Sequence, residues 1–229
     1  MLYFIMVMKM NNIPMFLSQG GTAALVLREI PYTQKAYVLL QTVIQDRLPL
    51  MIEECSRFCK TCGAQQIFFS WKDGPLPLKK DHDILNLTIQ KAVLPQGKPI
   101  RLQPICEAND SIYINIYNKC FSQVSNAAFY DRKQIQRIYL LHQKAYLALT
   151  EDGTPFGIGE LHENELAAIG ILPEYRGQGF ELALSLFQHC PGPEITLTVA
   201  SDNAPALRLY EKLGFHVSGI ASSWYLAES

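Results

Sequence analysis

The sequence lacks an excess of charge of either sign. Its 20 Lys and Arg residues face 21 Asp and Glu residues, so the formal net charge is −1 with histidine neutral. Basic residues are also not clustered, since no run exceeds a pair such as Lys79 and Lys80. Nucleic acids and anionic membranes capture proteins through basic clusters. We therefore expect neither a nucleic acid nor a membrane as a partner of this protein.

A long hydrophobic run is missing as well. The apolar stretch at residues 1–8 stops at Lys9, whereas a membrane-spanning helix needs about 20 apolar residues. No basic region precedes this stretch and no small-residue cleavage site follows it, so the sequence does not predict a signal peptide. These features predict a cytoplasmic protein.

Cysteines are few, and their spacing suits neither a metal site nor a disulfide framework. Three of the six fall in one predicted helix, and the others are scattered among apolar neighbours. Cys59 and Cys62 form a CxxC motif, but the second pair or the histidines of a zinc site do not accompany it. We therefore expect buried or unreactive thiols, no metal and no disulfide framework.

Apolar residues are numerous enough to form a substantial core. Hydrophobic residues make up 48% of the 229 residues and charged residues 18%, which excludes a disordered chain. Proline and glycine cluster at residues 73–77 and 94–99, where the apolar periodicity lapses. We expect a domain boundary there, with an N-terminal α+β domain at residues 1–98 and a second domain at residues 99–229.

Hydrophobic periodicity predicts an α/β (α+β) fold class. In the second domain we expect strands at 100–105, 144–150, 155–161, 165–172, 194–200, 215–220 and 222–227, and helices at 108–122, 131–142, 204–213 and one ending near Cys190. In the first domain we expect strands at 24–30, 36–44 and 65–71 and a helix at 47–62. This order of strand, strand, helix and strand echoes the second domain. The first domain is therefore either a degenerate relative of the second or an unrelated α+β extension.

A glycine-bearing turn links the strand at 165–172 to the helix that follows it. Pro173 ends the strand, and residues 176–179 read Arg-Gly-Gln-Gly before an amphipathic helix. Unbonded N–H groups at a helix start, the close approach that glycine allows and the helix dipole together suit a pyrophosphate. Arg176 can add a charge-assisted hydrogen bond. The alternative is an ordinary strand-to-helix turn, which also uses glycine.

A second capped helix follows the strand at 194–200. Residues 201–203 offer capping groups, Pro205 fits the first turn, and the apolar stripe contains Tyr210. Gly214 stands where the helix should end. Taken alone, this segment is a capped amphipathic helix with a core tyrosine.

Together, the turn and this helix resemble the acetyl-CoA-binding core of the GNAT N-acetyltransferase superfamily, over residues 99–229 in element order. The family's Q/R-x-x-G-x-G/A turn appears as Arg176 to Glu181, with Glu181 where the family has glycine or alanine. A carboxylate there repels a pyrophosphate, and the helix N-terminus offsets part of this repulsion. The resemblance implies the GNAT fold, a mixed and mostly antiparallel central sheet with a splayed strand and flanking helices. It also implies acetyl-CoA as cosubstrate and no metal.

The resemblance further implies roles for individual residues. The backbone of Ile169, Gly170 and Ile171 would pair with the pantetheine arm, and Asn203 would bind near it. Tyr210 would donate a proton to the departing thiolate, because a phenol is an O–H donor with an ordinary pKa of about 10. The pyrophosphate would be held by Arg176 and by the N–H groups of Gly177, Gln178, Gly179, Phe180, Glu181 and Leu182.

Acetyl transfer also needs a proton acceptor, because an alkylamine is mostly protonated at neutral pH. Glu165 lies six residues before Ile171, so a period of two would place residues 165, 167, 169 and 171 on one face of the strand. Glu165 also resembles, in its position, the glutamate base of the histone-acetylating branch of the superfamily. Competing candidates are Glu160, His162, Glu163 and water.

The resemblance therefore implies an N-acetyltransferase that moves an acetyl group from acetyl-CoA to a primary amine of a small molecule or peptide. No Ser-His-Asp or Cys-His arrangement is readable, which favours direct attack on the thioester without a covalent enzyme intermediate. The other hypothesis is a non-catalytic acyl-CoA-binding or sensor module, which would bind acetyl-CoA without turnover. The sequence identifies no particular amine, and it leaves the oligomeric state open, a homodimer included.

Overall fold

The computed structural model describes residues 13–227, and the apolar stretch at residues 1–8 lies outside this range. Internal contacts divide the chain into two compact units, Met1–Asp83 with Ser222–Ser229, and Ile84–Ala221. The division precedes the boundary expected near residue 98. It falls inside two strands, β5 (Lys79–Gln90) and β11 (His216–Leu226), so each of these strands contributes residues to both units.

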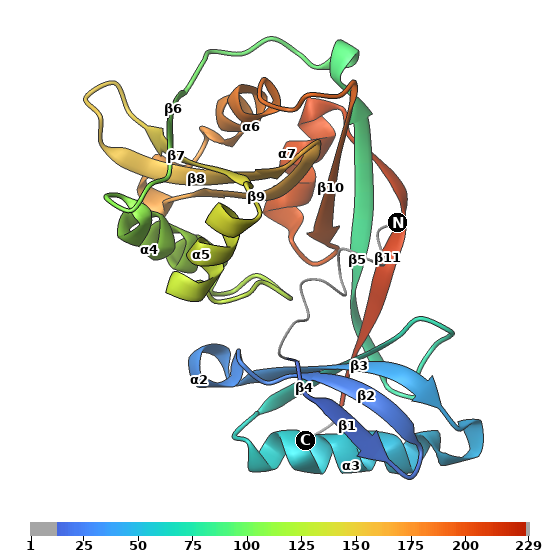
Figure 1. Ribbon diagram of the computed structural model, residues 1–229. Coiled ribbons are helices and arrows are strands. Elements are labelled where there is room, and N and C mark those ends of the chain that lie inside the picture. Colours follow the sequence, from blue (N-terminus) through green and yellow to red (C-terminus); the bar gives the residue numbers. More distant parts are fainter. Residues whose placement is uncertain (1–12, 228–229) are drawn as a thin grey trace. The chain divides into compact units, whose positions relative to one another are not determined.

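The first unit is a small sheet with one long helix against it (Figure 1). Neighbouring strands are antiparallel except β3 and β4, which run parallel because a helix connects them. Its elements are β1 (Met15–Ser18), β2 (Gly21–Val26), α2 (Ile30–Thr33), β3 (Lys35–Val43), a 3-10 turn (Gln45–Arg47), α3 (Leu48–Thr61) and β4 (Gln66–Trp71). The expected helix at 47–62 and the expected strands at 36–44 and 65–71 are confirmed.

The core of the first unit lies between α3 and the sheet. Met51, Cys55 and Cys59 of α3 are fully buried there, whereas Cys62 is exposed at the helix end. Burial raises the pKa of both Cys55 and Cys59 to about 12, so these thiols stay protonated at neutral pH. The CxxC motif thus pairs one buried thiol with one exposed thiol.

The second unit carries a larger sheet in the order β5-β10-β9-β8-β7-β6, with β11 beside β5. Its further strands are β6 (Arg101–Pro104), β7 (Lys144–Leu149), β8 (Pro155–His162), β9 (Glu165–Ile171) and β10 (Glu194–Ala200), and its helices are α4 (Asp110–Phe121), α5 (Arg132–Leu140), α6 (Gly179–Phe187) and α7 (Ala204–Leu213). The ladder of β9 and β10 is parallel, and those from β6 to β9 and of β5 with β10 are antiparallel. The mixed, mostly antiparallel sheet predicted from the sequence is confirmed.

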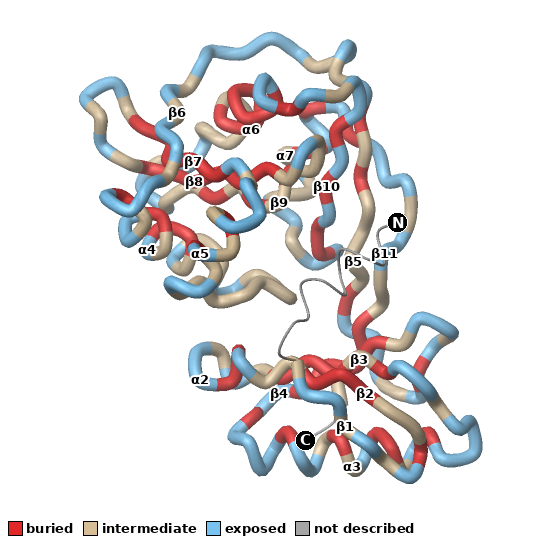
Figure 2. Tube along the Cα trace, viewed as in Figure 1, coloured by how far each residue is buried: buried red, intermediate tan, exposed pale blue. Residues whose placement is uncertain are grey.

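Two helical layers cover opposite faces of this sheet, and the buried residues follow them (Figures 1 and 2). Ile158 of β8 packs with Tyr113 and Ile135, from α4 and α5. The next residue, Gly159, faces the other way, and a Cβ there would collide with Leu186 of α6. Because successive strand residues point to opposite faces, α4 and α5 form one layer, and α6 forms the other together with α7.

Two expectations about strands are wrong, and the structure also contains a strand that was not expected. The strand expected at 24–30 ends at Val26, because the chain turns into α2, which begins with Ile30 and Pro31. The two strands expected at 215–220 and 222–227 form one strand, β11, and its last residues pair with β4. The sequence analysis also missed β5, whose polar first residues hide the alternation typical of a strand.

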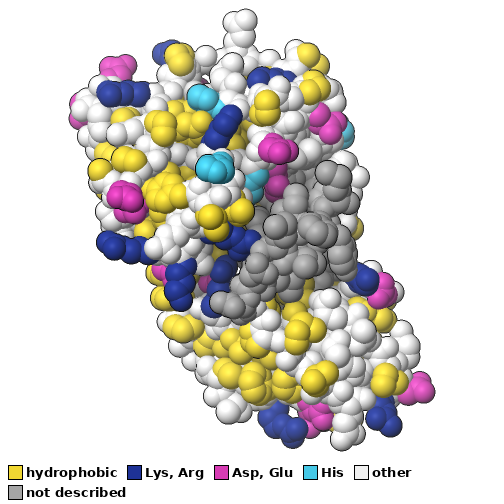
Figure 3. Space-filling view, viewed as in Figure 1, with side chains coloured by type: hydrophobic (Ala, Val, Ile, Leu, Met, Phe, Trp, Pro, Cys, Tyr) yellow, Lys and Arg dark blue, Asp and Glu magenta, His cyan; other side chains and the backbone are white. Residues whose placement is uncertain are grey.

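On the face drawn in Figure 3, acidic, basic and apolar side chains are intermixed over the second unit, so this face carries no large patch of a single charge sign. Within residues 13–227, no helix combines the length and the apolarity that crossing a bilayer requires.

Candidate functional site

The parallel strands β9 and β10 are joined only at one end. Their ladder pairs Thr196 with Glu165 and Leu197 with Leu166. Beyond these pairs β9 continues beside β8, and β10 continues beside β5. The edge of β9 that faces β10 is therefore open along residues 167–171. An open edge offers backbone N–H and C=O groups to an extended ligand.

At the end of β9, the glycine turn delivers a helix start to this opening. Gly177 has a φ of 104°, in the left-handed region that favours glycine, and α6 begins at Gly179. The Gln178 side chain does not cap the helix. The N–H of Leu182 donates to the Gln178 carbonyl at 3.0 Å. This amide is therefore not free to bind an anion, although the resemblance placed it among the amides that hold the pyrophosphate. The amides left for an anion are those of Gly177, Gln178, Gly179, Phe180 and Glu181.

Close packing fixes the glycine at the helix start. A Cβ on Gly179 would lie 3.3 Å from Cδ2 of Leu209 in α7 and 3.7 Å from Cδ1 of Ile171 in β9. Arg176 is exposed beside the turn, and Glu181 is half-buried in the first turn of α6. The structure thus brings the end of β9, the start of α6 and one face of α7 together.

Helix α7 begins and ends as expected. The Asn203 side chain caps it, because its Oδ1 accepts a hydrogen bond from the Ala206 N–H at 3.2 Å. Gly214, with a φ of 94°, ends it. Tyr210 is 6% exposed, and its ring centroid lies 5.8 Å from that of Phe215. Burial raises the pKa of Tyr210, so the phenol keeps its proton at neutral and alkaline pH.

A β-bulge in β9 overturns the expected face of Glu165. The pairing with β8 runs from His162 with Glu165 to Glu160 with Ala168, and the register shifts between these pairs. Residues directly opposite in an antiparallel ladder point to the same side, so Glu165 shares a face with Glu160 and His162. Ile169, next to Ala168, points to the α6 side. The expectation that residues 165, 167, 169 and 171 share one face is therefore wrong.

The face that carries Glu165 holds a buried hydrogen-bonded cluster around Glu160. Glu160 is 2% exposed. Its Oε2 accepts from the Tyr130 hydroxyl at 2.8 Å and from the Tyr113 hydroxyl at 3.2 Å, and its Oε1 lies 2.7 Å from Nε2 of His162. Burial, and next the charge of Glu160, hold the pKa of both tyrosines well above the usual value.

From the sequence, Glu160 and His162 are only competitors for the role of base, and no local pattern indicates Tyr113 or Tyr130. The alternation of β8 could have paired Glu160 with His162, since residues two apart share a face. The tyrosines come from α4 and from the loop before α5, and no local spacing links them to β8. Glu163, the other competitor, is exposed in the turn between β8 and β9.

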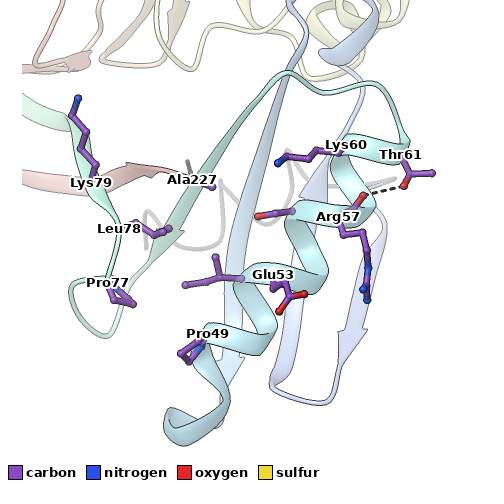
Figure 4. A pocket seen from close by; sticks show the side chains of 11 residues that line it. Pro49, Glu53, Arg57, Lys60, Thr61, Pro77, Leu78, Lys79 and Ala227 are labelled. Atoms are coloured by element: carbon purple, nitrogen blue, oxygen red, sulfur yellow. Dashed lines mark hydrogen bonds between the residues drawn. The ribbon is translucent and has the colours of Figure 1, made fainter. Parts of the chain in front are cut away.

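A separate hollow of about 950 Å³ lies in the first unit, between α3 and the segment before β5 (Figure 4). Glu53 and Lys60 line it from α3, and Pro77 and Leu78 line it from that segment. The connection from β4 to β5 is irregular over residues 72–78, whereas the connection from β10 to β11 contains α7. None of the predicted site residues lines this hollow.

Comparisons with known proteins support the same region. The model of the acetyltransferase (GNAT) family matches residues 111–215. Peptidyl-lysine N-acetyltransferase YjaB of Salmonella typhimurium is 29% identical over 96 residues, which are 42% of this chain and 66% of that relative's length. The chain therefore spans slightly less than two thirds of this curated relative.

Solved structures share the fold over most of the chain. A GCN5-related N-acetyltransferase from Kribbella flavida has a TM-score of 0.62 at 12% identity, covering 100% of this chain and 95% of that one. A functionally unknown conserved protein from Staphylococcus epidermidis has a TM-score of 0.61 at 15% identity, covering 95% of each chain. A tandem GNAT protein from the clavulanic acid biosynthesis pathway has a TM-score of 0.54 at 15% identity, covering 91% and 79%.

Proposed function

We propose, from the match of residues 111–215 to the model of the acetyltransferase (GNAT) family, that the protein transfers an acetyl group from acetyl-CoA to a primary amine. One observation carries the proposal. The open edge of β9 along residues 167–171 ends at a glycine turn whose helix-start amides are not used by α6. An extended arm that ends in a pyrophosphate fits this combination of an open strand edge and an anion site.

The residues present fit acetyl-CoA, which supplies an activated acyl group as a thioester. Ile169, Gly170 and Ile171 would bond its pantetheine arm through the backbone, and Asn203 would bind near the arm. The exposed Arg176 would add a charge-assisted hydrogen bond to the pyrophosphate. The pyrophosphate itself would be held by the amides of Gly177, Gln178, Gly179, Phe180 and Glu181.

On the same proposal, Tyr210 supplies the proton that the leaving thiolate needs. Its raised pKa keeps the phenol protonated, as a general acid must be before it acts. The proton acceptor for the amine would come from the face of β8 and β9 that carries Glu160, His162 and Glu165. Helices α4 and α5 cover the same face of the sheet. The acceptor would therefore approach on the face covered by α4 and α5, and the cofactor on the face covered by α6 and α7.

The acceptor class proposed for the first tests is the lysine side chain of a peptide, because the Salmonella relative is named for peptidyl-lysine. Glu165 is only partly buried on the acceptor face, and its negative charge would attract a cationic ammonium group. Polyamines and aminoglycosides carry the same group and belong in the same panel. Free thiol release from acetyl-CoA, followed with each amine, identifies the acceptor and separates an enzyme from a module that only binds.

In the described residues of the first unit, the parallel strands leave no open edge of the kind that this cofactor site uses, so we propose that the unit is a degenerate relative without a cofactor. Its parallel strands β3 and β4 are paired along six residues, from Lys35 with Gln66 to Leu40 with Trp71. The helix that connects them starts after Arg47 and carries Pro49 in its first turn. A closed ladder leaves no strand edge for a pantetheine arm.

Acetyl-CoA is therefore expected to bind with a stoichiometry of one per chain and to raise the melting temperature. A ligand that binds only the native state at a hundredfold excess over Kd stabilises by about 2.7 kcal/mol. Isothermal titration calorimetry gives the stoichiometry, and thermal melting gives the shift. No shift with either acetyl-CoA or desulfo-CoA at millimolar concentration would contradict the cofactor assignment. A stoichiometry of two would contradict the assignment of the first unit.

A further inference from the structure

We propose that His162, held by the buried Glu160, is the group that takes the proton from the acceptor amine, and that Glu165 attracts the amine without being the base. This inference rests on the proposed function and names the proton acceptor within it. His162 would be a catalytic residue. Glu160 would be a positioning residue, because it acts on the amine only through His162.

Glu160 is fully engaged in hydrogen bonds and lies out of reach of a substrate. The hydroxyl groups of Tyr113 and Tyr130 donate to its Oε2, and His162 occupies its Oε1. Its side chain is 3% exposed. Burial holds the pKa of both tyrosines well above the usual value, so they remain donors. Glu160 is therefore held in place by three hydrogen-bonding partners and cannot touch a substrate.

The hydrogen bond to Glu160 determines which ring nitrogen of His162 carries the proton. A carboxylate only accepts hydrogen bonds, so the hydrogen shared at 2.7 Å comes from Nε2 of the neutral imidazole. The lone pair then lies on Nδ1. The buried carboxylate that is hydrogen-bonded to Nε2 also stabilises the imidazolium that forms when Nδ1 is protonated. The His162 side chain is 14% exposed, whereas Glu160 is not accessible, so the imidazole is the outer end of the pair.

Glu165 is the direct partner of His162 across the ladder, but its side chain is held less firmly. In the part of the chain that the structure describes, no hydrogen bond or ion pair holds the Glu165 carboxylate. A group held in one orientation makes a more effective proton acceptor than one that must first be ordered. Two carboxylates lie beside His162, that of Glu160 at hydrogen-bonding distance on its own strand and that of Glu165 directly opposite on β9, and the phenols of Tyr113 and Tyr130 donate to Glu160.

The proton balance follows from this arrangement. An acceptor ammonium gives one proton to Nδ1 of His162, which passes it to solvent. The neutral nitrogen then forms the bond to the acetyl carbon, and the bond from that carbon to sulfur breaks. Tyr210 protonates the sulfur and regains a proton from the acylated nitrogen. The net products are an amide, a free thiol and one proton in solution, with no change in oxidation state.

The test compares four Glu or His to Gln variants with the wild type, using the best acceptor of the amine panel. His162→Gln is expected to lower kcat by about 10²- to 10⁴-fold at neutral pH, with the KM for acetyl-CoA unchanged. The loss should shrink as pH rises, because more of the amine is then free. Glu165→Gln should raise the KM for the amine with little change in kcat. Glu151→Gln, exposed in the turn between β7 and β8, is the matched control and should change neither.

Glu160→Gln tests the positioning role. In this variant the hydroxyl groups of Tyr113 and Tyr130 would donate to the oxygen of the new side-chain amide. The N–H of that amide would then donate to Nε2 of His162, so the ring proton of His162 would have to lie on Nδ1. We expect a loss of kcat similar to that of His162→Gln, and no further loss in the double variant, because the two residues act as one unit. Long-range 1H–15N correlation of the His162 ring should show the proton on Nε2 in the wild type and on Nδ1 in Glu160→Gln.

The outcomes of these experiments separate a failure of this inference from a failure of the proposed function. A His162→Gln variant that binds acetyl-CoA and turns over at the wild-type rate across pH 6 to 9 overturns the inference. A fall in kcat with Glu165→Gln in place of His162→Gln also overturns it and assigns the base to Glu165. If the wild type itself gives no acetyl-CoA shift and no thiol release, the proposed function has failed, which the wild-type data alone reveal. If Glu160→Gln does not fold, as melting would show, the His162→Gln variant and its pH profile still decide, because the His162 side chain is partly exposed.

Discussion

Gly179→Asp is expected to abolish the stabilisation by acetyl-CoA and to reduce acetyl transfer below detection. The aspartate adds a second carboxylate beside Glu181, in the turn whose amides would bind the pyrophosphate. Its Cβ would also lie 3.3 Å from Cδ2 of Leu209, so the end of the Leu209 side chain would have to move by a few tenths of an ångström, and the carboxylate would stand where the backbone must approach the phosphates. The melting temperature without ligand should change little, because an aspartate near a helix N-terminus is favourable. Thermal melting with and without acetyl-CoA measures both effects.

The matched control is Gly219→Asp. Gly219 lies in β11, and a Cβ there meets nothing within 4 Å. This variant carries the same added charge, and it should keep both the acetyl-CoA shift and the activity. If Gly179→Asp retained the full shift while the control behaved as the wild type, the pyrophosphate would have to bind elsewhere.

Tyr210→Phe is expected to lower kcat by about ten- to a thousandfold, while the protein still folds. The ring and its contact with Phe215 remain, so any loss of stability should stay near the value of one hydrogen bond, about 1 kcal/mol. The thiol of CoA has an ordinary pKa of about 8.5 by analogy with cysteine, so its thiolate leaves fairly readily even without protonation. The loss of Tyr210 as general acid should therefore slow the reaction without stopping it. A donor that acts mainly in the transition state lowers kcat and kcat/KM together.

Tyr146→Phe is the control for this prediction. Tyr146 is 8% exposed in the same core cluster, and the substitution removes the same hydroxyl group. Steady-state kinetics and a melting curve are needed for both variants. If Tyr210→Phe melts normally and turns over at the wild-type rate, Tyr210 is a core residue and not the general acid. Because burial raises the pKa of Tyr210, its ionisation should not limit the wild-type rate at alkaline pH.

The sequence by itself determined those parts of the site whose signals are local. The turn from Arg176 to Glu181 combines a strand end, two glycines and an amphipathic helix, and each of these acts through its immediate neighbours. The cap at Asn203 and the stop at Gly214 depend on side chains and backbone within one helical turn. For this reason α6, α7 and most strands of the second unit lie close to where the periodicity placed them.

Only the tertiary structure decided which residues meet across strands and layers. One extra residue in β9 opposite β8 reverses the face of Glu165, because a strand alternates strictly and a bulge shifts that alternation. Sequence spacing does not reveal the bulge, since the alternation of burial from Glu165 to Ile171 continues through it. The strand β5 is likewise set by its pairing with β10, a partner more than a hundred residues away in the chain.

The Glu160 cluster depends on the tertiary structure in the same way. Its members come from β8, from α4 and from the loop before α5, and they meet because a buried carboxylate must find donors wherever the packing supplies them. A local pattern can predict a helix start that binds an anion, since its own backbone makes the site. A buried charge with its three donors is assembled by long-range packing, and the order of residues along the chain does not contain that information in readable form.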